Sequence, residues 1–205
     1  MTDKRIYLAS RSPRRRELLK QIGVSFELLL LREDARRGVD VVETRLAGES
    51  PSDYAVRIAR AKAAGATTRV VQRRLQLYPV LAADTTVVLD DEVIGKPRDA
   101  GHAAQVLATL AGREHRVITA VAVSMGDQVE SSVSTSSVEF RALSAAEIQG
   151  YIASGEPFEK AGAYAIQGRA AAFVTRIDGS YSGIMGLPLA ETAELLRKVG
   201  IDVLR

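Results

Sequence analysis

The chain has 205 residues, of which 46% are hydrophobic and 26% charged, a composition that is typical of a globular protein and excludes a disordered one. It contains no cysteine, which excludes a disulfide framework, a thiolate metal site and a cysteine nucleophile. The net charge is only +3, but residues 1–20 hold seven Lys or Arg against two acids, which indicates an anionic ligand or partner near this end.

The first predicted unit is a strand, a turn and a helix that together carry four arginines. RIYLA at residues 5–9 predicts a short strand, and the following helix has Ser12 as its N-cap, Pro13 as its first residue and Gly23 as its end. The free N–H groups and the dipole at such a helix start favour an anion. The unit therefore predicts a phosphate site, although a solvated helix face is the common alternative for clustered arginines.

A second strand, a charged loop and a long helix follow. Residues 24–31 predict the strand, and residues 32–50 predict a loop with five acids and four bases and no clear period. A loop of this length is usually functional or mobile. Ser50, Pro51 and Asp53 then start a long helix with apolar residues at helical spacing.

The middle of the chain predicts two strands, a helix and an apolar strand. Residues 79–97 predict the two strands, with the triplet DTT at the end of the first and a turn at DDE. Asp99 caps a helix that Gly112 ends, and residues 115–125 predict a strand suited to a sheet covered on both faces.

The last third alternates strands and helices around one polar loop. The predicted elements are a less apolar strand nearer an edge of the sheet at 131–143, a helix through Ile152 with a capping box at Ser144 and Glu147, a loop at 154–168, a strand at 171–178 and an amphipathic helix at 187–200. This order predicts an α/β fold with a central mixed β-sheet flanked by helices, and we expect residues 1–205 to form one domain.

Several common catalytic signatures are missing. GKP at residues 95–97 lacks both the preceding glycine and the Ser or Thr of a P-loop, and the sequence has no GxGxxG or GxSxG. His102 and His115 have no partner at metal-ligand spacing. We expect His102 at the surface of a helix and His115 at the start of a strand. Five short motifs remain in a fixed order: SRSPRR at 10–15, RIARAKA at 57–63, ADTT at 83–86, GKP at 95–97 and KAGAYAIQG at 160–168.

In the order and spacing of these motifs, the sequence resembles the Maf family of nucleoside triphosphate pyrophosphatases over essentially its whole length. The resemblance implies a two-lobed fold similar to that of inosine triphosphate pyrophosphatases, with the nucleotide in the cleft. It implies hydrolysis to the monophosphate and pyrophosphate, assisted by Mg²⁺ or Mn²⁺. KAGAYAIQG is similar to the branch that acts on dTTP and UTP, and modified uridine triphosphates are further expected substrates.

The chemistry of a triphosphate fits the residues in the motifs. Its hydrolysis needs charge neutralisation, a positioned water and a metal more than it needs a protein nucleophile. Arg14 and Arg15, with Ser10 beside them, are the predicted triphosphate clamp, because a guanidinium binds phosphate oxygens in bidentate fashion. Lys62 and Lys96 are the predicted point charges supplied by other elements.

The remaining roles concern the reacting water, the metal and the base. Asp84 is the predicted catalytic base and a metal ligand, because it is expected to end an apolar strand beside a cleft, and it matches the family's catalytic aspartate. Glu33 or Asp34 is the further predicted metal ligand. The resemblance also makes Arg14, Thr85 and Gln167 specificity positions, and the amide of Gln167 offers a donor and an acceptor to a pyrimidine edge.

Each of these residues also has a purely structural interpretation. An arginine or Lys62 can be a solvated surface residue, and Asp84 or Lys96 can belong to a turn. Thr85 can be an ordinary strand residue, while Ser10 and Gln167 can make only local hydrogen bonds. The resemblance favours the functional interpretation in each case.

Two other functions stay open on the sequence. The same reaction on 7-methyl-GTP is the enzymatic alternative, and a cell-division regulator that docks DNA or a septum partner is the non-enzymatic one. With aromatics at only 5%, no stable nucleic-acid complex is expected. The N-terminus lacks an apolar signal stretch and no window is long enough to span a membrane, so we expect a cytoplasmic protein, and the resemblance implies a homodimer.

Overall fold

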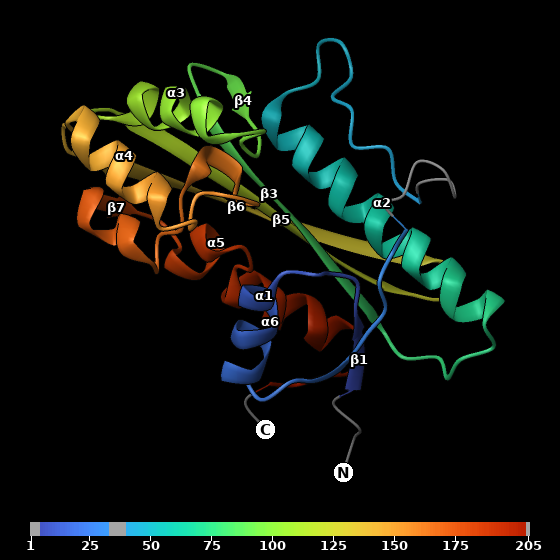
Figure 1. Cartoon of the computed structure of the whole chain (residues 1–205). Helices are drawn as coiled ribbons and strands as arrows, with labels where there is room; N and C mark the ends of the chain where they lie inside the picture. Colours follow the sequence, from blue (N-terminus) through green and yellow to red (C-terminus); the bar gives the residue numbers. More distant parts are fainter. Residues whose placement is uncertain (1–4, 33–39, 204–205) are drawn as a thin grey trace.

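A mixed sheet of seven strands runs through the centre of the computed structural model, which describes residues 5–32 and 40–203 (Figure 1). The strands are β1 (Arg5–Leu8), β2 (Ser25–Leu28), β3 (Val80–Leu89), β4 (Glu92–Ile94), β5 (Glu114–Met125), β6 (Gln128–Phe140) and β7 (Val174–Asp178). Their order is β2-β1-β3-β5-β6-β7, with β4 paired to β3. β1 pairs in parallel with β2 and with β3, and all other pairs of neighbouring strands are antiparallel. This confirms the predicted mixed sheet.

Helices cover both faces of this sheet. They are α1 (Pro13–Gln21), α2 (Pro51–Gln72), α3 (Ala100–Leu110), α4 (Ala145–Ala153), α5 (Tyr181–Met185) and α6 (Leu189–Lys198), with short 3-10 turns η2 (Ala161–Ala163) and η3 (Arg169–Phe173). Within residues 5–32 and 40–203, none of the helices has the length and apolarity that a bilayer crossing requires.

Alternating side chains of β3 divide the main core into two layers. Val80 and Ala82 pack under the small residues of α2, whereas Leu81 and Ala83 pack with α1 and α6 on the opposite face. A run of alanines along α2 lets this helix lie close to the sheet. The 2-residue period of the strand thus places consecutive residues of the ADTT motif on opposite faces.

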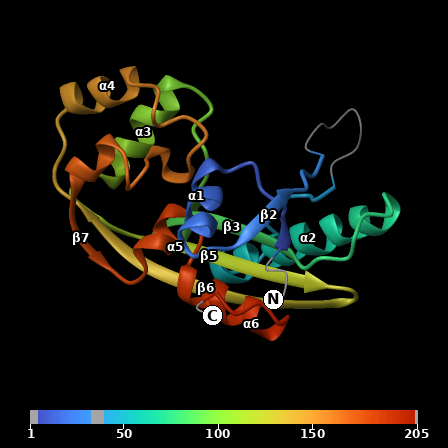
Figure 2. The ribbon, with the colours of Figure 1, turned by 90° about the horizontal axis from the view of Figure 1, so that it is seen from below.

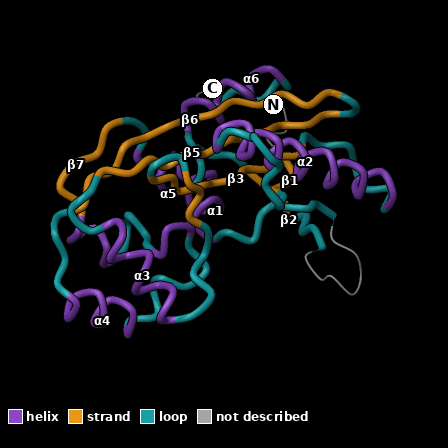
Figure 3. The backbone as a smooth tube through the Cα atoms, turned by 90° about the horizontal axis from the view of Figure 1, so that it is seen from above, coloured by secondary structure: helices purple, strands orange, loops and turns teal. Residues whose placement is uncertain are grey.

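A third core forms the second lobe. It joins α3, α4 and the 160–173 segment to the far ends of β3, β5 and β6. Figures 2 and 3 show α3 and α4 together at one end of the sheet, away from α2, β1 and β2. This two-lobed arrangement agrees with the prediction. The starts of α3 and α4 also follow the predicted caps, since Asp99 accepts the His102 N–H and Ser144 forms a capping box with Glu147.

Two predictions about the elements are wrong. The first strand does not end at DTT, because it continues through residues 87–89 and pairs with β5 as far as Val88 with Arg116. The strand predicted for 171–178 begins only at Val174, because residues 169–173 form η3. The sequence interpretation also missed α5, whose five residues are too few to show a helical period.

Candidate active site

The candidate site lies where one edge of β3 has no neighbouring strand. On this side β1 pairs with β3 at Val80 and Leu81, and β4 pairs with it from Val87 to Leu89. Residues 83–86 pair with β5 on the opposite side, but no described strand pairs with them on this side, where a cleft of about 950 Å³ opens. Asp84 therefore reaches the cleft from the middle of a strand, which corrects its predicted place at a strand end.

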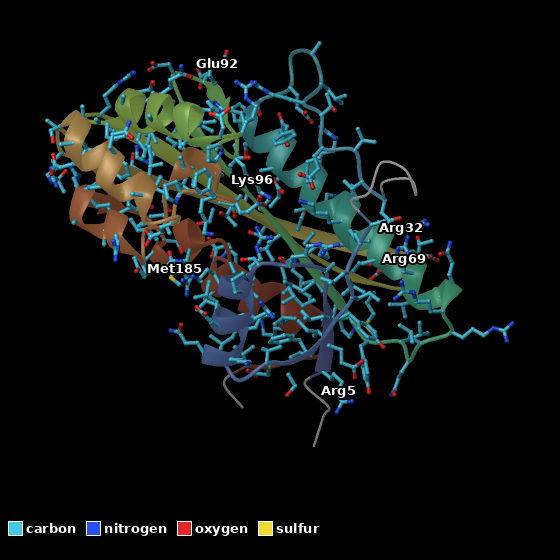
Figure 4. All side chains as sticks on the ribbon, in the orientation of Figure 1. Arg5, Arg32, Arg69, Glu92, Lys96 and Met185 are labelled. Carbon is cyan, nitrogen blue, oxygen red and sulfur yellow. The ribbon has the colours of Figure 1, made fainter. Side chains whose placement is uncertain are left out.

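All predicted site residues that the structure describes line this cleft. They are Ser10, Arg14, Arg15, Lys62, Asp84, Thr85, Lys96 and Gln167. The predicted metal ligands Glu33 and Asp34 lie outside the described residues. In Figure 4, Lys96 lies between the two lobes, beside the end of β4. Five motifs from different elements thus meet at one surface.

Arg15 is at the centre of the first cluster. Its Nε donates to the carbonyl oxygen of Gly186 at 2.8 Å, and its two Nη atoms donate to the hydroxyls of Ser10 and Thr85, each at 3.2 Å. Burial lowers the pKa of Arg15, and the charges of Asp84 and Glu43 partly offset this effect. No carboxylate among the described residues lies within ion-pair distance, so this cation has only neutral oxygen partners.

The missed helix α5 contributes to the Arg15 cluster. It ends at Gly186, whose φ of 116° lies in the left-handed region that glycine tolerates best. Thr119 of β5 donates to the carbonyl oxygen of Gly183 at 2.8 Å and lies 3.0 Å from the Thr85 hydroxyl. The guanidinium of Arg15 is therefore oriented by three elements that are far apart in the sequence.

The start of α1 leaves backbone donors open to the cleft. Ser12 and Pro13 occupy the predicted cap and first helical positions, but the Ser12 side chain makes no capping hydrogen bond. Arg14, one residue further, is partly exposed and forms an ion pair with Glu17 at 2.8 Å. Free N–H groups beside two arginines form a surface suited to an anion.

Two carboxylates share one lysine in the second cluster. Lys62 Nζ lies 2.8 Å from Asp84 Oδ1 and 2.8 Å from Glu43 Oε1. Asp84 is only 9% exposed, whereas the Glu43 side chain is half exposed. Sequence reasoning missed Glu43, because the charged loop shows no period and the only signal was the number of acids in it.

Ion pairs on both sides of Glu43 hold its loop against α2. Asp40 accepts two hydrogen bonds from Arg69, each at 2.7 Å, and these lower the pKa of Asp40. Hydrogen bonds from Arg57 likewise lower the pKa of Glu49 to about 2. The Tyr54 hydroxyl donates to the Glu43 carbonyl oxygen at 3.0 Å. Burial, with the charges of Asp84 and Glu43, raises the pKa of Tyr54 to about 12.

The opposite wall of the cleft belongs to the second lobe. Lys96 follows β4 and lies 3.3 Å from Glu159 in an exposed ion pair. Gln167 lies half-buried in the segment between η2 and η3. Behind it, the Tyr164 hydroxyl and His115 Nε2 are 2.8 Å apart in the core of the lobe.

The carboxylates of Asp84 and Glu43 are suited to a divalent cation that is also bound by substrate phosphates. No group of three or more His, Cys, Asp or Glu that could hold a metal occurs in the described parts of the chain. Asp84 and Glu43 nevertheless both face one ammonium group, so their oxygens already converge on a cationic centre. Mg²⁺ typically uses one or two carboxylates and completes its coordination with water and substrate phosphates.

The chain is similar to several known proteins. A family model described as Maf-like protein matches residues 5–199. The chain is 58% identical to the dTTP/UTP pyrophosphatase of Nitrosomonas europaea, over 97% of this chain and 96% of that protein. It is 56% identical to the dTTP/UTP pyrophosphatase of Aromatoleum aromaticum, over 96% of both. Among solved structures, the Staphylococcus aureus Ham1 protein is similar with a TM-score of 0.44 and 18% identity, over 66% of this chain and 71% of that one.

Proposed function

The chain belongs to the Maf family, as its five motifs predicted, and from that premise we propose that it is a nucleoside triphosphate pyrophosphatase that hydrolyses dTTP and UTP. The products are the nucleoside monophosphate and pyrophosphate, and the role is to clear the nucleotide pool. The observation that carries the proposal is that the eight described site residues predicted from the five motifs all line one cleft. The names of the relatives favour pyrimidine triphosphates over 7-methyl-GTP.

Triphosphate binding begins at Arg15 and the start of α1. A partly buried guanidinium that has only neutral oxygen partners is a favourable site for a phosphate, since a charged acceptor strengthens its hydrogen bonds. The free N–H groups of α1 add donors to the same anion. Arg14 and Lys96 are in exposed ion pairs, and both exchange their carboxylate partner for phosphate in this proposal.

Asp84 orients and deprotonates the attacking water. One oxygen of the Asp84 carboxylate accepts the proton as the water oxygen bonds to the α-phosphorus. Lys62, which binds the other oxygen in the structure, moves to the phosphates when the substrate is bound. The bond between the α-phosphorus and the bridging oxygen breaks, and pyrophosphate leaves. Lys62, Lys96 and Arg15 neutralise the charge on the phosphates.

Asp84 and Glu43 would hold Mg²⁺ or Mn²⁺ together with phosphate oxygens, and the ion would supply charge neutralisation. Glu43 thus takes the role that the sequence assigned to Glu33 or Asp34. Lys62 must then shift toward the phosphates, because its ammonium group lies between the two carboxylates. We also propose a homodimer, which rests on the family resemblance, and a cytoplasmic location, which was expected from the sequence.

Base selection belongs to the wall formed by the second lobe. Gln167 presents an amide that pairs with the donor and acceptor edge of uracil or thymine. Thr85 acts through the Arg15 guanidinium that its hydroxyl contacts, and Arg14 also lines the cleft.

The test is a panel of triphosphates with Mg²⁺ or Mn²⁺ and resolved products. We expect dTTP and UTP to give monophosphate and pyrophosphate faster than the purine triphosphates and 7-methyl-GTP. Preference for 7-methyl-GTP would refute the substrate assignment, and products of orthophosphate and diphosphate would refute the reaction. Tight, salt-sensitive DNA binding without hydrolysis would instead support the regulatory alternative.

A further inference from the structure

We propose that Glu156 and Tyr151 are positioning residues that fix the loop carrying Gln167 and thereby determine base selectivity. Neither residue lines the cleft, so neither touches the substrate. The inference rests on the proposed function, because it concerns how the same site recognises the base. Gln167 lies between the two short turns η2 and η3, outside any regular helix or strand.

One carboxylate binds the backbone that follows Gln167. Glu156 Oε2 accepts the Arg169 N–H at 3.0 Å, and Oε1 accepts the Ala170 N–H at 3.4 Å. These are the first two N–H groups of η3, which have no acceptor within that turn. Glu156 therefore fixes the chain two and three residues beyond Gln167.

Tyr151 extends this support to the backbone that precedes Gln167. Its hydroxyl donates to Glu156 Oε1 at 3.0 Å and accepts the Ala165 N–H at 3.3 Å. The ring is 4% exposed and packs edge-on against Phe173, with 5.1 Å between the ring centroids. A rigid residue of α4 thus anchors one side of the loop, and its carboxylate partner anchors the other.

The backbone between these anchors turns tightly. The Gly168 N–H donates to the Ala165 carbonyl oxygen at 2.9 Å, so Gln167 is the third residue of a β-turn. Ile166, the residue before it, is 4% exposed and anchored in the core of the lobe. With the turn closed and both flanks held, the direction of the Gln167 side chain is set by the backbone.

Gly168 shows how closely the carboxylate approaches the loop. A Cβ atom at this position would lie 2.2 Å from Glu156 Oε1 and 2.4 Å from Cδ. The backbone of Gly168 has an ordinary negative φ, so conformational freedom does not explain this glycine. The contact with Glu156 does, and any side chain at residue 168 must displace the carboxylate.

Selectivity depends on this support because a hydrogen-bonding amide discriminates only when it is held in place. A displacement of about 1 Å is enough to lose a productive hydrogen bond to the base edge. The phosphate clusters at Arg15 and Lys62 belong to other elements, and within the described residues neither Arg15 nor Lys62 forms a hydrogen bond or ion pair with Glu156. Loss of the support should therefore weaken base recognition and leave phosphate binding intact.

The test compares two ligands, UTP and inorganic tripolyphosphate, which has no base. Glu156→Gln places an amide N–H₂ where a carboxylate oxygen accepted a backbone N–H. We expect the KM for UTP to rise roughly tenfold and the UTP preference over CTP in kcat/KM to fall by a similar factor. The kcat for UTP and the inhibition constant of tripolyphosphate should stay within about twofold, because the phosphate clusters are unchanged.

Two further variants separate positioning from simple loss of structure. Tyr151→Phe keeps the packing and removes only the hydroxyl, and it should give the same split. Glu147→Gln is the matched control, because this carboxylate of α4 accepts hydrogen bonds from the Ser144 N–H, the Ser144 hydroxyl and Arg141 but forms none with residues 160–168. The control should keep the wild-type selectivity.

Gly168→Ala should reproduce the Glu156→Gln effect, and adding it to Glu156→Ala should cost little more. Wild-type UTP KM and selectivity in both Glu156→Gln and Tyr151→Phe would overturn the positioning role. So would equal losses for UTP and tripolyphosphate. A wild-type protein that hydrolyses neither UTP nor dTTP would overturn the proposed function, and this proposal with it, before any variant is made.

Discussion

His115 is a buried imidazole that should make the stability of the protein fall below about pH 6.5. The residue is 2% exposed, and its Nε2 lies 2.8 Å from the Tyr164 hydroxyl. Burial lowers the pKa of His115 from 6.5 to about 4.

The sign of the effect follows from which state binds the proton first. Between pH 6.5 and 4 the unfolded chain is protonated at His115 while the folded protein is not, so acid favours unfolding. At pH 5 this difference lowers the free energy of unfolding by about 2 kcal/mol, and below pH 4 by about 3 kcal/mol in full. Above pH 6.5 it has no effect.

The assay is thermal or urea unfolding from pH 8 to pH 5 for the wild type and His115→Gln. Between these pH values the wild-type Tm should fall by roughly 4–8 °C more than the variant's. His102→Gln is the control, because it removes the other histidine, at the surface of α3. Parallel pH profiles of the wild type and His115→Gln would refute the reasoning, whatever the variant costs in stability at pH 8.

Four other outcomes follow from the site. Asp84→Asn should lower kcat by roughly 10²–10⁴-fold with the fold retained, and near-wild-type turnover in steady-state assays would exclude it as the base. Arg15→Lys should lower kcat/KM by roughly 10–100-fold, whereas Arg16→Ala, on the same helix, should not; equal effects would contradict the clamp. Asp40→Asn should lower the free energy of unfolding at pH 7 by roughly 1.5 kcal/mol. The hydrogen bonds from Arg69 lower the pKa of Asp40, so this ion pair stabilises the folded state only while the carboxylate is ionised. An unchanged urea unfolding curve would count against the ion pair. A chelator should stop hydrolysis until Mg²⁺ or Mn²⁺ is restored, and full activity in its presence would exclude a metal.

Local signals were sufficient for most helices and for the inner strands. The caps at Ser50, Asp99 and Ser144 and the apolar run of β5 are determined by neighbouring residues, so the sequence predicts them directly. The end of β3 was not predictable in this way. Polar residues at 84–86 resemble a strand end, but here Lys62 and Arg15 bind them, and the strand continues.

The candidate site was predictable where a motif marked it and not where tertiary contacts made it. The five motifs named eight of the described residues in the cleft. Glu43 was missed, because its place depends on Asp40 and Glu49 binding α2 from both sides. No pattern within the charged loop shows which of its acids pair with distant arginines.

The most direct test of the central claim is hydrolysis of UTP in ¹⁸O-labelled water, with mass spectrometry of both products. Attack of a water oriented by Asp84 on the α-phosphorus predicts one ¹⁸O atom in UMP and none in pyrophosphate. Label in pyrophosphate, or products of UDP and orthophosphate, would contradict it.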